Sequence, residues 1–446
     1  MDFVGKIMNT MIVFTSLFFN KKGNQSFYET IKEYSKYYHI VIITSYHDDE
    51  YFYDLSELEY KALNNIEIYR TPQLLYKLLK KFIKRKNNNK YDNSNSSDEI
   101  INAKYTIYNL LNYYYSFFFQ FFIFLLYRLV MKIKNIEIVC AYEIGGVLAA
   151  LITKKIIRNS KLIAKMQGTV LFNLLFKYNR NIKDYYLDYI AYKRLKRFDY
   201  ITMTNDGTCG DAVLNYFGVD KKKIIFLPNG ISSTIINTRL NFKNNSYNYI
   251  AIKNAKIHLM TLSRLIAWKR VDLAIEIANA LANEMKFNGF ILDIYGFGTQ
   301  DEIFRLKKLI NKFRLENNVN IKGSANYEYV PDILLRHDIL LSLYKDTNVT
   351  NPVLEAAYLN MPIITIKNKD LLSILNIDSE DNNIFLFDEF DIKELVHDIA
   401  DFIRKINIIE LREKSFKLRM SNNIHKIYSW EDRIKIEISQ IINKEK

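Results

Sequence analysis

Two cations in the second half of the chain lie in a segment suited to a diphosphate. The segment 263–272, SRLIAWKRVD, follows an apolar run and opens a helical pattern. Within it, the guanidinium of Arg264 can fork onto two phosphate oxygens, and Lys269 adds a compact point charge. A strand-to-helix turn with two such cations predicts an anion site. Taken alone, the same turn would more often be a solvated basic loop.

A second segment, 350–357, offers an anion the start of a helix. Its sequence TNPVLEAA follows another apolar run, with Asn351 as the expected N-cap and Pro352 at the first helical position. The free N–H groups of this turn, which includes Val353, and the helix dipole favour an anion. Glu355, one turn inside, could accept hydrogen bonds from ribose hydroxyls. Because both segments end strands of one half of the chain, they favour a nucleotide site over two unrelated structural motifs.

Apolar runs alternate with helical patterns along the whole chain. The runs are rich in Ile, Val and Tyr and show little polar alternation, as expected for parallel strands buried on both faces. This alternation predicts α/β architecture with two doubly wound parallel sheets. The expected strands are 12–18, 39–46, 66–69, 136–142, 162–166, 200–204, 224–227, 257–262, 290–295, 319–322, 339–343, 363–366 and 384–387. The helical patterns include 27–37, 147–157, 185–197, 271–281 and 302–313.

The length of 446 residues is too great for one compact core and favours two domains. We expect a first domain over 1–248, in which the polar stretch 86–98 forms a flexible loop. A second domain is expected over 249–428, with the polar stretch 237–248 as part of the connection. The final segment, 429–446, is an amphipathic helix.

Composition narrows the class of protein without deciding it. Hydrophobic residues make up 49% and charged residues 25%, as in an ordinary globular protein, and the net charge of +14 favours anionic partners. No recognition-helix, zinc-finger or RNA-binding signature is present, so a nucleic-acid partner is not expected. The two cysteines, Cys140 and Cys209, form no CxxC motif, which favours a reducing, cytoplasmic setting and no structural zinc. P-loop, zincin and nucleophile-elbow motifs are missing.

The aromatic segment 108–127 is nearly long enough to span a bilayer. Polar residues recur along it every three to four positions, at Asn109, Asn112, Ser116 and Gln120, so a helix here would carry a weak polar stripe. The segment also falls between two strands of what reads as one sheet. We therefore favour a packed helix, with a helix dipping into a membrane face as the alternative and a membrane span as the least favoured interpretation.

With these motifs in place, the chain from Met11 to Asn443 resembles the retaining glycosyltransferases of GT-B fold, in the large glycosyltransferase family 4 (glycosyl transferases group 1). The resemblance implies two Rossmann-like domains that face a central cleft. It also implies transfer of a sugar, with retention of configuration, from a nucleotide diphosphate sugar to a glycan or lipid-linked acceptor. Arg264 and Lys269 occupy the positions of the family's diphosphate-binding pair and are expected to be catalytic.

Further site residues follow from the same resemblance. In the second half, Gly296 and Gly298 match a strand-end glycine pair, 319–323 matches the strand near the base, and Glu355 matches the ribose-binding end of a Glu-x7-Glu motif. In the first half, the expected donor-side residue is Gly23. The expected acceptor-side residues are Gln167, Gly168, Asn205 and Asp206. The segment 228–230 matches the motif before the hinge. Trp430 matches the aromatic that begins the last helix, and the resemblance implies that this helix, 429–446, returns to the first domain.

The chain departs from the family pattern at the donor sugar. Thr347 stands eight residues before Glu355, where relatives carry the first Glu, and Asp346 is adjacent. A non-catalytic nucleotide- or sugar-binding relative therefore stays open as an alternative, as does, on charge alone, a basic membrane- or nucleic-acid-binding protein. Since cations and a helix start would stabilise the diphosphate, we expect no cofactor and no obligatory metal. The expected partners are a nucleotide sugar and its acceptor, with peripheral contact at the cytoplasmic face of a membrane.

Overall fold

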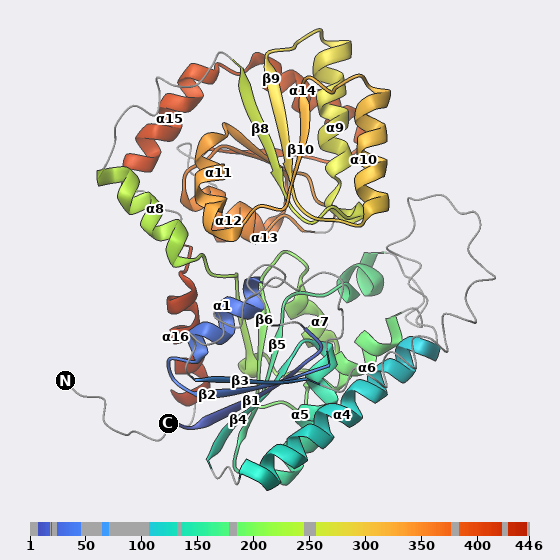
Figure 1. Ribbon diagram of the computed structural model, residues 1–446, viewed down its shortest axis with the longest axis vertical. Coiled ribbons are helices and arrows are strands. Elements are labelled where there is room, and N and C mark those ends of the chain that lie inside the picture. The colour runs from blue at the N-terminus through green and yellow to red at the C-terminus, as the bar shows by residue number, and fades with distance from the viewer. Residues whose placement is uncertain are drawn as a thin grey trace. The chain divides into compact units, whose positions relative to one another are not determined.

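The computed structural model describes residues 8–17, 19, 25–45, 65–70, 107–131, 135–177, 185–244, 256–345, 347–375, 383–421 and 427–443 (Figure 1). The chain forms two compact units. Unit 1 comprises Met1–Leu227 and Glu431–Lys446, and unit 2 comprises Pro228–Trp430. The division thus falls after Leu227, 21 residues before the expected boundary at 248.

Unit 1 is built on a seven-stranded sheet in the order β3-β2-β1-β4-β5-β6-β7. All neighbouring strands run parallel; β1, for example, pairs with β2 from Thr10 opposite His39 to Thr15 opposite Thr44. The order reverses between β1 and β4, which marks the switch point of a doubly wound sheet. The strands are β1 Thr10–Thr15, β2 His39–Thr44, β3 Ile66–Arg70, β4 Ile136–Tyr142, β5 Lys161–Met166, β6 Tyr200–Thr204 and β7 Ile224–Leu227.

Helices cover both faces of this sheet. One buried cluster lies under α4, α5, α6 and α7 and includes Phe124 and Tyr192, and the other lies under α1 and α16 and includes Phe27 and Ile434. The helices are α1 Gln25–Tyr34, α4 Ile107–Met131, α5 Val147–Ile156, α6 Tyr186–Leu195, α7 Gly210–Tyr216 and α16 Trp430–Asn443. Short 3-10 or π turns lie at η1 Ile144–Gly146, η2 Asn173–Lys177 and η4 Lys221–Lys223.

A buried ionic cluster fastens α16 to unit 1. Glu437 of α16 pairs with Lys165 of β5 and lies 3.4 Å from Arg433, and it accepts a hydrogen bond of 3.0 Å from the hydroxyl of Tyr34. Burial opposes the ionisation of Glu437, but the charges of Lys165 and Arg433 outweigh it and lower its pKa. The C-terminal helix therefore belongs to unit 1 through charge pairing as well as through apolar contacts.

Unit 2 repeats the architecture with a six-stranded parallel sheet in the order β10-β9-β8-β11-β12-β13. Two buried clusters, one on each face, contain Leu292 and Leu340 respectively. The strands are β8 Ile257–Leu262, β9 Phe290–Tyr295, β10 Val319–Gly323, β11 Ile339–Ser342, β12 Ile363–Ile366 and β13 Ile384–Phe387. The helices are α8 Ser233–Asn244, α9 Val271–Asn279, α10 Gln300–Lys312, α11 Val330–Arg336, α12 Asn351–Tyr358, α13 Lys369–Leu375, α14 Ile392–Lys405 and α15 Ile408–Met420. Short turns lie at η5 Ala267–Lys269, η6 Ala280–Glu284 and η7 Tyr327–Tyr329.

The described part of the polar stretch expected to connect the domains is instead the end of a helix. Residues 237–244 belong to α8, which packs into unit 2 through buried Ile235 and Arg239. Arg239 donates to the carbonyls of Tyr358, Leu418 and Ser421. A polar sequence can form such a helix because only one face has to be buried. The expected loop 86–98 lies outside the described residues.

The aromatic segment 108–127 forms α4, a helix that contacts α5 and β2 of unit 1. Its window Leu110–Leu129 is long and apolar enough to cross a membrane on length and composition, and 28% of that window is buried. Ser116 and Gln120 of the expected polar stripe are both buried. These two polar residues therefore point into the unit, contrary to the usual arrangement of a surface helix.

Candidate functional site

The carboxyl ends of β8 and β11 form the switch point of the sheet in unit 2. These two strands are neighbours, and the strand order runs away from them in opposite directions. Arg264 and Lys269 lie in the turn after β8, and the loop after β11 leads through Thr347 into α12. Because ligands of doubly wound sheets bind at this place, the two predicted anion-binding segments converge where a nucleotide would be expected.

Lys269 joins these two loops through aromatic rings. Its Nζ lies 4.0 Å from the ring centroid of Trp268 and 3.8 Å from that of Tyr344. The backbone N–H of Lys345 donates to the carbonyl of Trp268 at 3.1 Å, so the two loops are also tied by their backbones. Cation–π contacts restrict the position of the ammonium without neutralising its charge. Lys269 is thus placed in advance and still carries a charge that an anion can use.

Tyr344 is held in turn by the loop that precedes α12. It is buried, its hydroxyl donates to the carbonyl of Leu262 at 3.1 Å, and burial raises its pKa to about 12. The side chain of Asn348 accepts hydrogen bonds from Ser342 Oγ at 3.2 Å and from the N–H of Tyr344 at 3.0 Å. This network fixes the ring against which Lys269 lies.

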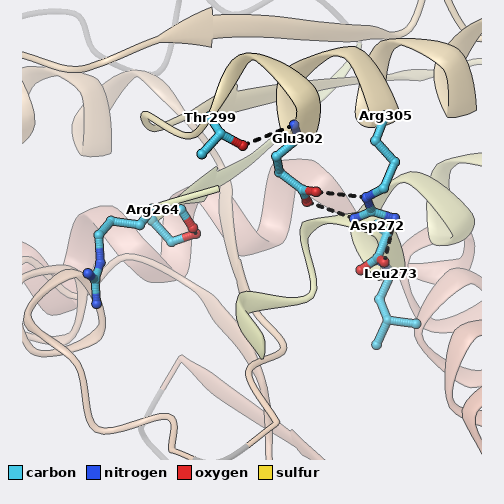
Figure 2. Close-up of polar contacts among 7 residues, drawn as sticks. Arg264, Asp272, Leu273, Thr299, Glu302 and Arg305 are labelled. Carbon is cyan, nitrogen blue, oxygen red and sulfur yellow. Dashed lines mark hydrogen bonds and ion pairs between the residues drawn. The ribbon is translucent and has the colours of Figure 1, made fainter. Parts of the chain in front are cut away.

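Arg264 differs from the other arginines around this turn. Arg270 is buried and forms a bidentate pair with Glu389, and Arg305 binds Glu302 at 2.8 Å and Asp272 at 3.2 Å. Figure 2 shows the side chain of Arg264 extending away from the Asp272–Glu302–Arg305 group. Among the residues that the structure describes, its guanidinium has no hydrogen-bond or ion-pair partner.

The charge of Arg264 is consequently available to a ligand. The residue is exposed, yet desolvation by the surrounding protein lowers the pKa of its guanidinium. Since the ordinary pKa is above about 12, the group remains a cation at neutral pH. A partly desolvated cation without a carboxylate partner gains more from a bound phosphate than one that is already paired.

The predicted glycine pair lies against the turn that carries Arg264. A Cβ on Gly296 would come within 1.8 Å of the carbonyl oxygen of Ser263, and one on Gly298 within 2.7 Å of Leu265 Cβ. The N–H of Leu265 donates to the carbonyl of Phe297 at 2.7 Å. The glycines are therefore needed for the turn after β8 to meet the segment after β9. Their expected approach to a nucleotide stays a prediction.

The start of α12 differs by one residue from the expected cap. The N-cap is Thr350, and Asn351 and Pro352 are the first two helical residues. The first intrahelical bond runs from the N–H of Leu354 to the carbonyl of Thr350 at 3.0 Å. Proline is tolerated at the second position because no N–H of the first turn has an intrahelical partner. Asn351 Oδ1 instead accepts a hydrogen bond of 2.9 Å from Asn229 in the predicted motif 228–230.

The two residues at the ends of the expected Glu-x7-Glu motif are both buried. Glu355 is 2% exposed and accepts a hydrogen bond of 3.4 Å from the hydroxyl of Tyr327. Thr347 is 5% exposed, and its Oγ1 accepts from the N–H of Val349 at 3.3 Å. Thr347 thus shapes the loop, and Asp346 lies outside the described residues. The role of Glu355 toward a ribose stays a prediction.

In unit 1, the predicted acceptor-side residues come together at the carboxyl edge of the sheet. Gly168 follows β5 with a φ of 127°, and a Cβ there would come within 2.2 Å of the carboxylate of Asp206. Asp206, after β6, accepts hydrogen bonds from the N–H and hydroxyl of Thr208 at 3.1 and 2.6 Å. The backbone N–H of Asn205 donates to the carbonyl of Leu227, the last residue of β7, at 2.8 Å. The expected donor-side residue Gly23 lies outside the described residues.

Glu143 is a functional candidate that the sequence reasoning missed. It directly follows β4 beside the switch point, and its backbone has a φ of 62° and a ψ of 172°. This region is essentially restricted to glycine and costs about 1–3 kcal/mol for other residues. Such strain persists where the surrounding structure enforces it, and it often marks a functional site.

The carboxyl group of Glu143 lies in an unusual electrostatic setting. Its Oε1 accepts a hydrogen bond of 2.6 Å from the N–H of Gln167. Burial raises its pKa to about 8, with Asp188 and Asp206 adding to the rise and the Gln167 N–H opposing it. The available sequence signal was a glutamate directly after an apolar run and shortly before the pair Gly145-Gly146. The structure shows why a glycine is needed there, since a Cβ on Gly146 would meet the carbonyl of Phe14 at 2.0 Å.

Among the described residues, no group of three or more His, Cys, Asp or Glu side chains could hold a metal ion. Asp293 of β9 is instead bound by His337 at 3.2 Å, by Asn320 at 2.8 Å and by Lys322 at 3.5 Å. Burial opposes the ionisation of Asp293, but these contacts outweigh it and lower its pKa. His337 is thus a structural partner of Asp293. Independence from metals stays a prediction.

The two tandem sheets are those of the GT-B fold, and solved structures share this fold over nearly the whole chain. HepE from Anabaena, solved with UDP, aligns with a TM-score of 0.60 at 12% identity, covering 98% of this chain and 100% of HepE. Sucrose-phosphate synthase from Thermosynechococcus elongatus gives 0.62 at 11% identity, with 98% of both chains covered. TarM gives 0.61 at 16% identity, covering 98% of this chain and 99% of TarM.

A match to a family model adds information on the second half of the chain. Residues 244–416 match the family model described as Glycosyl transferases group 1, whereas no curated protein matches the chain by sequence. Residues 244–416 of unit 2 thus resemble a glycosyl transferases group 1 domain, and the chain is a glycosyltransferase of the GT-B fold. The predicted fold and enzyme class are confirmed.

Proposed function

We propose that the chain transfers a sugar from a nucleotide diphosphate sugar, bound by unit 2, to a glycan or lipid-linked acceptor, with retention of configuration. The observation that carries this proposal is the pair of cations after β8. Lys269 is held between two rings, and Arg264 has no ionic partner among the residues that the structure describes. Paired cations held ready at a switch point suit a pyrophosphate.

The donor diphosphate would be stabilised as it leaves. When the bond between the sugar C1 and the diphosphate oxygen breaks, negative charge grows on that oxygen, and Arg264 and Lys269 would bind it together with the N–H groups at the start of α12. Removal of one such preorganised group typically raises the activation free energy by about 3–4 kcal/mol. Because these groups supply the charge, we propose that neither a cofactor nor a divalent metal is required.

The rest of the donor would lie along the same sheet edge. Glu355 would accept from the ribose, the segment 319–323 would lie near the base, and the loop with Thr347 would contact the sugar. HepE was solved with UDP and with UDP-glucose, which makes these ligands the first probes for this chain.

The acceptor would be bound by unit 1 at the carboxyl edge of its sheet. Gln167, Asp206 and the strained Glu143 present an amide and two carboxyl groups there, which suit hydroxyl groups. In a retaining transfer the acceptor oxygen forms its bond to C1 on the face that the diphosphate leaves. The departing diphosphate oxygen takes the acceptor's proton. Glu143, with a pKa near 8, would orient the hydroxyl rather than act as a fully ionised base.

The test begins with binding and continues with turnover. Thermal shifts are measured with UDP, GDP, ADP and dTDP sugars, and products formed from the stabilising donor are analysed for transfer and anomeric configuration. Loss of turnover in excess EDTA would contradict the proposed independence from metals. Binding of a nucleotide diphosphate without transfer or hydrolysis would favour the non-catalytic alternative, for which the replacement of the first Glu by Thr347 is the specific observation.

A further inference from the structure

Helix α4 of unit 1 has its apolar side outward and its polar side inward. Large apolar side chains are exposed along one face at intervals of three or four residues, and Leu129 is 74% and Phe118 60% exposed. The other exposed members are Leu111, Tyr114, Phe122 and Leu126. Eighteen residues of helix span about 27 Å, so this is a continuous stripe rather than scattered contacts.

The inward face explains why the helix adopts this orientation. Gln120 is fully buried, and its amide donates to the carbonyl of Thr15 at 2.7 Å and to Ser45 Oγ at 3.3 Å. Phe124 and Tyr127, on the same face, belong to the core cluster under the sheet. Rotating the helix to hide the outer stripe would expose these groups and break the bonds of Gln120. The exposed stripe is therefore enforced by the fold.

Positive charge surrounds the stripe. Figure 1 shows α4, α5 and α6 on one side of the sheet of unit 1, and α5 contacts both neighbours. Helix α4 contains no acidic residue, α5 contains none and α6 contains only Asp188. Exposed cations on or directly after these helices are Arg128, Lys155, Arg158, Lys193, Lys196 and Arg197.

We propose that this face of unit 1 docks onto an anionic lipid surface, with the stripe of α4 inserted at the level of the headgroups and the flanking cations on the phosphates. An apolar helix face bordered by Lys and Arg is the usual composition of an interfacial helix. A span is disfavoured although the helix is long enough, because crossing the bilayer would pull Gln120 and Phe124 out of the core.

Docking would also position the proposed acceptor site, and this part of the inference rests on the proposed function. Gln120 binds the last residue of β1, and α4 also contacts η1, which directly follows Glu143. The helix therefore passes the carboxyl edge of the sheet, where the acceptor-side residues lie. A membrane under α4 would bring this edge close to the headgroups, which favours a lipid-linked acceptor over a free glycan.

The test compares the full-length protein with two triple variants in vesicle sedimentation. The first carries Leu111→Ser, Phe118→Ser and Leu129→Ser. The matched control carries Phe304→Ser, Phe390→Ser and Ile409→Ser, three exposed apolar side chains of unit 2. Vesicles are made of phosphatidylcholine alone or of phosphatidylcholine with phosphatidylglycerol.

We expect the wild type and the control to bind the anionic vesicles, more weakly at high salt, and the α4 variant to bind at least about tenfold more weakly. The inference is overturned if the wild type does not bind, or if the α4 variant binds like the control. It is also overturned if the stripe instead holds a dimer, seen as a wild-type dimer that the α4 variant converts to a monomer without any vesicle binding. Stabilisation by UDP, measured on all three proteins, reports the donor site separately.

Discussion

The ammonium of Lys269 lies 3.8 Å from the ring centroid of Tyr344, and these residues follow different strands, β8 and β11. Neither residue could hold this geometry alone, because a lysine side chain in a turn is mobile and a tyrosine in a loop can turn outward. The contact joins the two segments that sequence reasoning had singled out separately. It also allows a direct test of whether the position of the Lys269 ammonium, and not only its charge, contributes to diphosphate binding.

The first prediction concerns the charges. Arg264→Ala and Lys269→Ala should each lower kcat/KM by about a hundredfold or more, as expected for the loss of one preorganised group that stabilises the leaving diphosphate. The measurement is steady-state kinetics with the donor found by thermal shift. Lys308→Ala, at an exposed cation on α10, is the control and should keep wild-type rates. Near-wild-type turnover of either site variant would remove that residue from the site.

The second prediction separates the ring of Tyr344 from its hydroxyl. Tyr344→Phe keeps the surface on which Lys269 lies and loses the bond to Leu262, so stability should fall by about 1 kcal/mol with little change in turnover. Tyr344→Leu removes the ring and should weaken nucleotide diphosphate binding as well. Calorimetric titration with UDP checks both variants. Equal affinities for the two would mean that the ring does not place the ammonium.

The third prediction is a pH dependence caused by Glu143. Its pKa in the folded protein, about 8, is above the ordinary value of 4.5, so the folded state holds the proton more tightly than the unfolded state. The resulting stabilisation is complete below about pH 4.5 and is lost as the pH rises through about 8. Glu143→Gln keeps the acceptor for the Gln167 N–H but cannot ionise. Its melting temperature relative to wild type should therefore increase between these pH values.

The strain at Glu143 can be tested by a different substitution. Glu143→Gly removes both the carboxyl group and the side chain that disfavours a φ of 62°, so the variant should be at least as stable as wild type while losing acceptor turnover. Chemical denaturation and product formation are measured on the same preparation. A large loss of stability would indicate that the residue serves the fold and not the acceptor.

The fourth prediction concerns the attachment of α16. Glu437→Ala leaves Lys165 and Arg433 buried without their carboxylate partner, and the free energy of unfolding should fall by about 3–5 kcal/mol. The exposed pair Lys435–Glu431 on the same helix offers the contrast, since Glu431→Ala should change stability by less than about 1 kcal/mol. Urea denaturation measures both. Equal small effects would show that apolar contacts alone hold the helix.

The sequence by itself was sufficient to locate the strands to within about three residues of their observed bounds. Strands such as β4 Ile136–Tyr142 and β9 Phe290–Tyr295 lie within the predicted runs, because a parallel strand buried on both faces must be apolar throughout. The two anion-binding segments were also readable, since their chemistry and their place after a strand are local properties. Capping was predicted one residue late, because Thr350 and Asn351 are both acceptable N-caps and only the backbone decides between them.

Contacts between distant parts of the chain decided the rest. The polar stretch 237–248 was assigned to a connection, yet its residues 237–244 belong to helix α8. Arg239 of this helix donates to backbone carbonyls more than a hundred residues away. Nothing in the sequence around Glu143 predicted its raised pKa. That shift arises only in the fold, where β4, β5 and β6 place Gln167 and Asp206 near its carboxyl group. In α4, Gln120 is buried because its amide donates to the carbonyl of Thr15 at the end of β1. Periodicity in a sequence shows that a helix has two faces, but only the surface against which it packs determines which of them meets the solvent.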